Sequence, residues 1–243
     1  MTARLAMVLA LAGVAFSQTK APDFSGTWDP YRGRPGADPK LAAPPATPLV
    51  LKPQLEKAYE DRRKLEADSL AKGEQLATGG SQCIPYGMPT MMQVAVYPME
   101  LVLTPNKIMI VTEAFSEVRR VYMDRPQLPW DEVPPGYYGR SVGKWDGDTL
   151  VIDTVGIKPS VAGYRGIPHS TQMHITERMR LMSPDVLHDT ITLEDPETLE
   201  KPLTYTLAYK RMAKDYEMVE FVCDNQREYV DEKGVVRMRV KSK

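Results

Sequence analysis

Glu177 is the residue whose position in the sequence most clearly suggests chemistry. It falls in a row of alternate apolar residues, as on the buried face of a strand, and this row consists of Met173, Ile175, Met179 and Leu181. Burial removes a carboxylate from water, which raises its pKa unless a cation lies beside it. Glu177 is therefore either a general acid or base in an apolar pocket or one partner of a buried ion pair. The cations that could form such a pair from elsewhere in the fold are Arg119, Arg120 and Arg211.

Histidine is the second candidate for acid–base chemistry, and the chain has three. His169 lies in a segment rich in glycine and proline, which is typical of a loop, so we expect it to be the acid or base that would work with Glu177. His174 begins the strand that carries Glu177, and a short turn after that strand would place His188 far along it from His174. Three ligands on one metal are therefore not expected, and the sequence predicts neither a metal site nor a cofactor.

The sequence motifs of several common enzyme classes are absent. There is no Gly-x-Ser-x-Gly, no His-Glu-x-x-His, no glycine loop that would bind phosphate and no dinucleotide fingerprint. Asp146 and Asp148 are not followed by the further ligands of a calcium loop. The 14 methionines are spread through the chain, which favours core packing over copper binding.

The aromatic residues suit a pocket for a ring-bearing or partly polar molecule. Twelve tyrosines accompany only four phenylalanines, and Tyr205 and Tyr209 share a predicted strand face with Leu203 and Leu207. Such an interior would be mostly apolar but would contain hydroxyl groups. The candidate ligand-binding residues are Arg120, Tyr122, Trp130, Tyr138, Trp145, His174, Tyr205 and Tyr209.

Asp146-Gly147, between two alternating segments, is a strong signal for a β-hairpin. A two-residue turn centred there predicts that Trp145 lies opposite Asp148 and Arg140 opposite Asp153. The first pair sets the register, and the second would be a cross-strand ion pair. Trp145, Leu150 and Ile152 would then share one face of the hairpin.

The period of the apolar residues is two from Gly79 onward, which predicts a mainly β protein. The candidate strands are Met92 to Tyr97, Met99 to Thr104, Lys107 to Thr112, Glu117 to Met123, Arg140 to Trp145, Asp148 to Val155, Met173 to Met182, Val186 to Leu193, Leu203 to Met212, Glu217 to Cys223 and Val235 to Val240. So many short strands, joined mostly by tight turns, favour an antiparallel, lipocalin-like barrel or sandwich. The long loops between some of them are where binding residues are expected.

The segment before these strands is expected to be a first strand, a proline-rich arm and a helix. The strand is predicted at Asp23 to Asp29, the arm at Tyr31 to Pro53, and one amphipathic helix at about Pro53 to Lys72. The helix would either cover a sheet edge or barrel end or form a lid over a pocket. We expect residues 18–78 and the β domain 79–243 to form one structural domain.

The N-terminus predicts export. Arg4, an apolar run of about a dozen residues and a cleavage pattern near Ser17 are typical of a signal peptide over residues 1–17, and the run is too short to span a membrane. In the periplasm or outside the cell, Cys83 and Cys223 are expected to form a disulfide in preference to two free thiols. The balance of 31 basic and 32 acidic residues argues against nucleic acid or an anionic membrane as a partner.

Several motifs together resemble a large group of mostly uncharacterised exported bacterial proteins. These motifs are Cys83-Ile-Pro-Tyr-Gly-Met-Pro, Val121-Tyr-Met-Asp, Gly143-Lys-Trp-Asp-Gly-Asp-Thr-Leu-Val-Ile-Asp-Thr, Pro168-His-Ser, Thr176-Glu-Arg, Glu194-Asp-Pro and Glu220-Phe-Val-Cys-Asp-Asn. The resemblance implies a shared fold and assigns no catalytic residue. Separately, Gly26-Thr27-Trp28 is similar to the Gly-x-Trp that opens the first strand of lipocalins and related calycin barrels.

Two hypotheses about function follow. The favoured one is an exported β-barrel protein that binds a small, mostly apolar or aromatic molecule. The other is a cofactor-independent lyase, isomerase or hydratase that uses Glu177 and His169. The sequence does not specify the ligand, the reaction or the oligomeric state.

Overall fold

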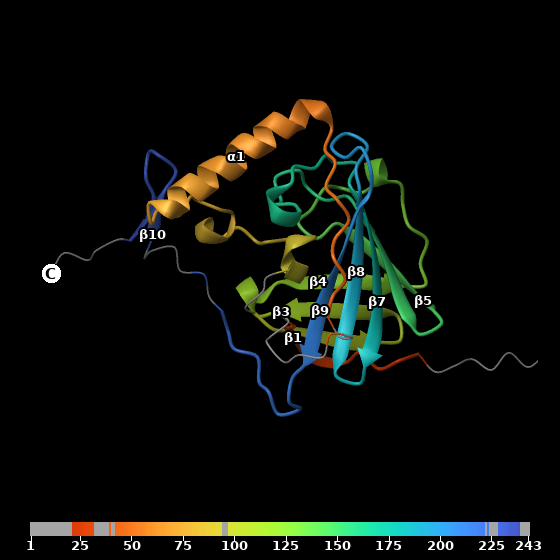
Figure 1. The fold of residues 1–243 in the computed structure, drawn as a ribbon. Coiled ribbons are helices and arrows are strands. Elements are labelled where there is room, and N and C mark those ends of the chain that lie inside the picture. The colour runs from red at the N-terminus through yellow and green to blue at the C-terminus, as the bar shows by residue number, and fades with distance from the viewer. Residues whose placement is uncertain are drawn as a thin grey trace, which may run out of the picture.

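The protein is a closed β-barrel with one long helix beside it (Figure 1). The computed structural model describes residues 21–31, 39, 42–93, 97–221, 223 and 228–238. The signal peptide predicted at residues 1–17 and part of the proline-rich arm lie outside the described residues. No helix in these ranges is long and apolar enough to cross a membrane.

Nine strands form the barrel in the order of the sequence, and β9 pairs with β1 to close it. The strands are β1 (Gly26–Pro30), β2 (Met99–Thr104), β3 (Lys107–Thr112), β4 (Val118–Met123), β5 (Arg140–Asp146), β6 (Thr149–Val155), β7 (His174–Ser183), β8 (Val186–Glu194) and β9 (Leu203–Arg211). The mainly β, barrel-like fold class expected from the alternating pattern is confirmed. The reason is that one face of each strand is apolar and turns inward.

One pair of neighbouring strands differs from the antiparallel expectation. Strands β4 and β5 are parallel, with Val121 beside Ser141. A parallel pair needs a long connection that returns the chain to the same end, and residues 124–139 supply it. The prolines and aromatic residues of this connection therefore cross the outside of the barrel.

The β5–β6 hairpin forms, but its register differs from the expected one. Asp146 pairs with Thr149 and Trp145 with Leu150, so the two turn residues are Gly147 and Asp148. Gly147 has a φ of 63°. This suits a type II′ turn, in which only the first of the two central residues needs a positive φ. The predicted ion pair is therefore wrong, because Val142 lies opposite Asp153 and Arg140 lies opposite Val155.

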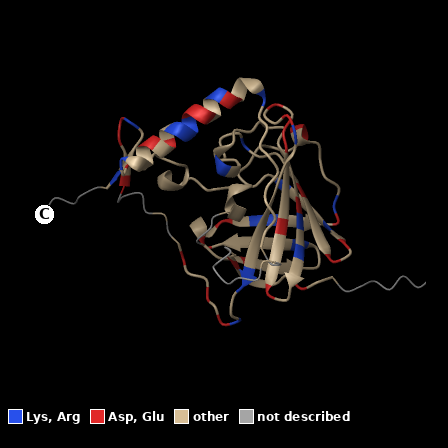
Figure 2. Ribbon diagram, viewed as in Figure 1, with Lys and Arg blue, Asp and Glu red and all other residues tan. Residues whose placement is uncertain are grey.

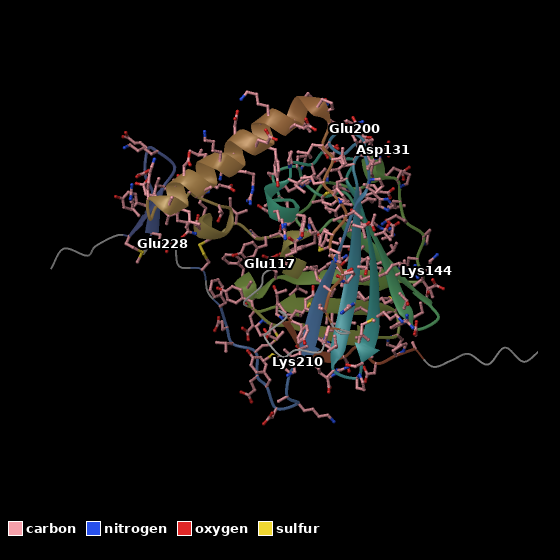
Figure 3. All side chains as sticks on the ribbon, viewed as in Figure 1. Glu117, Asp131, Lys144, Glu200, Lys210 and Glu228 are labelled. Carbon is pink, nitrogen blue, oxygen red and sulfur yellow. A yellow bond between two sulfur atoms is a disulfide. The ribbon has the colours of Figure 1, made fainter. Side chains whose placement is uncertain are left out.

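Aromatic side chains close the end of the barrel that carries this hairpin, which we call the hairpin end. Trp28 is fully buried, and its ring nitrogen donates a hydrogen bond of 3.0 Å to the carbonyl of Phe24. The guanidinium of Arg211 lies 4.1 Å from the centre of the Trp28 ring. Phe24 also meets Trp145 edge to face, at 5.2 Å between ring centres. This end is thus packed, and Lys210 is labelled beside it in Figure 3.

Helix α1 (Pro53–Ala71) has almost the predicted bounds. Pro53 suits the first turn, and Gly73, with a φ of 73°, allows the chain to leave the helix. Its apolar stripe is only partly packed, because Tyr59 packs against the core whereas Leu65 is 51 % and Leu70 74 % exposed. Figure 1 shows α1 lying diagonally across one end of the barrel, which we call the helix end. The helix thus lies at a barrel end, which is one of the positions expected for it, with part of its apolar stripe exposed.

The chain after β9 returns along the outside of the barrel to α1. The predicted disulfide is confirmed: Cys83 and Cys223 are bonded, with their Cα atoms 5.6 Å apart. The described part of the predicted strand from Glu217 to Cys223 is not a strand, because a closed barrel has no free edge for it to pair with. A small hairpin, β10 (Glu228–Val230) and β11 (Val236–Met238), follows near the C-terminal end of α1.

The predicted strand from Met92 to Tyr97 is also wrong where it is described. Met92 and Gln93 belong to a 3₁₀ turn, η3 (Thr90–Gln93), and residues 94–96 lie outside the described residues. Met91 and Met92 are both buried although they are adjacent in sequence. A helical turn can bury two successive side chains, whereas a strand turns them to opposite faces.

Candidate functional site

The barrel encloses an ion pair that joins opposite parts of its wall. Glu177 on β7 points inward as expected and is fully buried. Arg119 on β4, also fully buried, donates to both oxygens of this carboxylate, with a distance of 2.8 Å from Nη1 to Oε1. A bidentate pair of this kind fixes both side chains.

Two hydroxyl groups complete the partners of Arg119. Its Nε donates to Ser141 Oγ at 3.0 Å, and its Nη2 donates to Thr154 Oγ1 at 2.9 Å. The two hydroxyl oxygens are themselves 2.9 Å apart, on the paired strands β5 and β6. The guanidinium is therefore held from three sides, which stabilises a buried charge that would otherwise be costly.

Asp189 on β8 is a second buried carboxyl beside this pair. Neither of its oxygens has a hydrogen-bond donor within reach among the described residues. Burial raises the pKa of Asp189 well above its usual range, and repulsion from Glu177 raises it further, against the opposing effect of Arg119. When protonated, Asp189 can donate to Glu177, so the two carboxyls share one proton.

Sequence reasoning missed Asp189, although the signal was present. Asp189 alternates with Leu187 and Ile191 in one apolar row, just as Glu177 alternates with its neighbours. With Arg119 charged, Glu177 ionised and Asp189 protonated, the group is neutral overall. A carboxylate already held by a guanidinium is a poor acid or base, so this arrangement argues against the predicted catalytic role for Glu177 and favours the ion pair.

A pocket of about 690 Å³ lies at the helix end, and we call it the helix-end pocket. Its walls come from α1, from residues 77–86 and from the loop of residues 159–168. Its lining includes the apolar residues Ala77, Ile84, Pro85, Val161, Ala162 and Ile167. Thr90 and Gln93 of η3 line its inner side.

The inner side of the helix-end pocket connects to the barrel core through Gln93. The side-chain nitrogen of Gln93 donates to the Tyr205 hydroxyl at 2.9 Å. The Tyr205 ring, which is buried, is stacked on Tyr164 with 3.9 Å between ring centres and 14° between planes. Tyr164 begins the short turn η6 (Tyr164–Gly166), so β9 positions the loop that forms one wall. Tyr209, also on β9, donates to the carbonyl of Met92 at 2.7 Å and holds η3 in the same way.

His169 supports the same wall. Its Nε2 lies 2.9 Å from the carbonyl oxygen of Val161, and its Nδ1 lies 3.0 Å from that of Ser170. The side chain is buried, and both ring nitrogens are occupied by the backbone. Among the described residues, His169 makes no hydrogen bond or ion pair with Glu177. The contacts of His169 therefore favour a role in holding the loop over the predicted acid–base role.

Glu117, labelled in Figure 3, holds the opposite wall. Its carboxylate accepts hydrogen bonds from the backbone nitrogens of Tyr86 and Gly87 at 2.5 and 3.0 Å. Burial nevertheless raises the pKa of Glu117. The ring of Tyr86 lies over Gly80, where an added Cβ would come within 2.8 Å of the tyrosine oxygen. This wall is thus closely packed around the ring.

The remaining predicted ligand residues do not gather at one site. Trp145, Tyr205 and Tyr209 belong to the interior, as described above. Trp130 is 40 % exposed. Tyr138 is hydrogen-bonded to Glu117, and burial together with this neighbouring carboxylate raises the pKa of the Tyr138 hydroxyl. Arg120, Tyr122 and His174 lie on the outer face, since each alternates with an inward-facing neighbour. A second hollow of about 550 Å³ lies on that face, lined by Gln127, Lys144, Asp153 and Thr176 among others.

His174 pairs with Asp153 across β6 and β7. The His174 Nε2 and the carboxylate are 2.8 Å apart, and this hydrogen bond raises the pKa of His174. Burial opposes ionisation of Asp153, but its hydrogen bonds with His174 and Gln127 prevail and lower its pKa. Within the described ranges, no three His, Cys, Asp or Glu side chains form a group that could hold a metal ion.

Comparisons with known proteins add little to this geometry. No family model matches the chain, and no curated protein matches it. The solved structures that are similar in part include "REP1-NXSQ fatty acid transporter", at 12 % identity and a TM-score of 0.34, with 78 % of this chain and 96 % of that one covered. Another is a tyrosine-to-phenylalanine mutant of that transporter, at 12 % identity and a TM-score of 0.33, with 77 % and 97 % covered. A likeness at this level says nothing of what this chain binds.

Proposed function

We propose that this protein binds a small, mostly apolar molecule in the helix-end pocket. The observation that carries the proposal is a hollow of about 690 Å³ with apolar residues on two walls and a few polar groups on its inner side. Ligand pockets commonly have volumes of about 300–1,000 Å³ and this kind of lining. The lining also includes the aromatic residue Tyr86.

The walls of the pocket are held by contacts that do not depend on a ligand. Glu117 fixes the backbone at Tyr86, His169 fixes the carbonyl of Val161, and Thr90 Oγ1 donates to the carbonyl of Ala162. A site whose walls are already in place loses less entropy when a ligand enters, so its affinity is higher. These supports favour binding as the role of this end of the barrel.

The enzyme hypothesis has weaker support. Glu177 is held by Arg119, and His169 is held by two carbonyls, so neither predicted catalytic group is free to exchange a proton with a substrate. We therefore do not extend the proposal to a reaction.

We also propose that the protein is exported to the periplasm or beyond. The disulfide between Cys83 and Cys223 supports this, because such bonds persist in oxidising compartments. The sequence pattern of residues 1–17 supports it independently.

The proposal is tested by titration with N-phenylnaphthylamine, a neutral apolar dye that fluoresces when it leaves water. We expect saturable binding to the wild type. Ala162→Trp should weaken it at least about tenfold, because the new ring would occupy a pocket of drug-sized volume. Ala162 is exposed, so this variant should fold normally.

Ala213→Trp is the matched control, since it adds the same ring at an exposed alanine that does not line the pocket. Binding by the control should equal that of the wild type. The proposal is contradicted if the wild type binds no dye, or if Ala162→Trp binds it as tightly as the control does.

A further inference from the structure

The rim of the helix-end pocket carries an excess of positive charge. Arg62 and Arg63 of α1 and Arg165 of η6 contribute three guanidinium groups, and Glu66 is the one carboxylate among the lining residues. Figure 2 shows blue and red segments interspersed along α1 and a blue segment on the short coil beneath it, so the excess belongs to the pocket lining and not to the helix as a whole. A ligand at this rim therefore meets two positive charges that the lining does not neutralise.

Glu66 is shared between the two arginines of the helix. Its carboxylate oxygens lie 2.8 Å from Arg62 Nε and 3.2 Å from Arg63 Nη1. One carboxylate cannot neutralise both guanidiniums, and about half of each arginine side chain is exposed. These two groups supply a diffuse positive field on one side of the pocket.

Arg165 is held in place without a carboxylate. Its guanidinium lies 5.1 Å from the centre of the Tyr164 ring, and no carboxylate is within 4 Å of it among the described residues. Tyr164 in turn is stacked on Tyr205 of the barrel wall. The cation lies beside an aromatic ring and makes no hydrogen bond among the described residues, so its donors are available to a ligand.

The backbone at Arg165 adds an independent observation. Its φ is 52°, in the left-handed region that a residue with a Cβ rarely adopts. Holding a non-glycine residue in this region costs free energy, and such residues tend to cluster at functional sites. Here the strained residue is the cation on the pocket rim.

We propose that the natural ligand is a carboxylate with an apolar tail or ring, whose head group binds Arg165 and whose apolar part fills the helix-end pocket. This rests on the proposed function. A purely apolar ligand would leave the unpaired guanidinium unused. A polyanion such as a nucleotide would place several charges against the apolar residues Val161, Ala162 and Ile167. Guanidinium and carboxylate groups match in geometry, which favours a single planar head group.

The test compares pairs of ligands that share an apolar part and differ in whether they carry an anionic group. N-phenylnaphthylamine is paired with its sulfonated derivative anilinonaphthalenesulfonate, and decanol is paired with decanoate as a competitor of either dye. We expect each anion to bind at least about fivefold more tightly than its neutral partner at low salt. The ratio should fall as salt is added, because the rim is exposed to solvent.

Arg165→Gln should reduce the ratio of anionic to neutral affinity about three- to tenfold. Arg178→Gln is the control, because it removes the same charge from the outer face, where Arg178 pairs with Asp146. That variant should keep the wild-type ratio.

Each outcome has a distinct meaning. The proposal of an anionic ligand is overturned if neutral and anionic ligands bind equally, or if Arg178→Gln lowers the ratio as much as Arg165→Gln does. In either case the proposed function, binding of an apolar molecule in the helix-end pocket, is not contradicted. If decanoate fails to compete while the sulfonated dye binds, the head group is not a carboxylate and this proposal is overturned. If neither dye binds, the proposed function itself fails.

Discussion

At the scale of residues, the barrel core depends on two carboxyls and one guanidinium that together carry no net charge. Breaking a buried ion pair usually costs about 3–5 kcal/mol, because the remaining charge has no partner. Here Asp189 lies next to Glu177 and Arg119 and can release its proton to replace a lost carboxylate. The group should therefore tolerate loss of either acid better than loss of both.

We accordingly predict strong coupling between these acids. Glu177→Gln should cost less than about 3 kcal/mol in the free energy of unfolding, because Asp189 then ionises beside Arg119. Asp189→Asn alone should stabilise the protein at pH 7, since an amide can donate to Glu177 as the protonated acid does and has no ionised form for the unfolded chain to favour. The double variant should cost about 1–3 kcal/mol more than the sum of the single ones, measured by urea unfolding. Additive costs would show that Asp189 is no reserve partner.

The raised pKa of Asp189 also predicts a pH dependence of stability. In the folded protein Asp189 keeps its proton above pH 4, whereas in the unfolded chain it ionises near its usual pKa of 3.8. The folded state then binds more protons, so this group makes stability fall as pH rises from about 4 toward the raised pKa, by up to about 1.4 kcal/mol per pH unit. Asp189→Asn should remove that slope. An unchanged slope in the variant would mean that Asp189 titrates normally.

At the scale of elements, alternation was enough to locate most barrel strands. The predicted bounds of Met99 to Thr104 and Lys107 to Thr112 match β2 and β3, because their side chains alternate between core and surface. The hairpin register was one residue off, since a glycine can occupy either central position of a tight turn. Only the pairing of the two strands determines which of the two positions the glycine takes.

The helix shows where a pattern misleads. Its apolar residues recur at helical spacing, which correctly indicates a helix, but spacing says nothing about what the helix faces. Here α1 lies across the helix end of the barrel, where Tyr59 packs against the core while Leu65 and Leu70 stay exposed. The helix contributes Arg62, Arg63 and Glu66 to the candidate site, and none of its leucines.

At the scale of the whole molecule, the fold was predictable and the pocket was not. Nine strands with one apolar face each can hardly avoid a closed barrel or a sandwich. The pocket, by contrast, is assembled from α1, residues 77–86 and residues 159–168, which are far apart in sequence. No local pattern says that these segments meet. The number of tyrosines nevertheless indicated a site with aromatic residues, and Tyr164 stacked on Tyr205 supports one wall of the pocket.

The central claim is that a small apolar molecule occupies the helix-end pocket, and amide chemical-shift mapping by NMR tests it most directly. On addition of decanoate, the largest shifts should occur at Gly79, Gly80, Val161 and Gly163, which line the pocket on two different walls. Shifts of comparable size in both segments would place the ligand between them. If the largest shifts instead fall on the outer-face hollow at Lys144 and Asp153, or no residue responds, the account is contradicted.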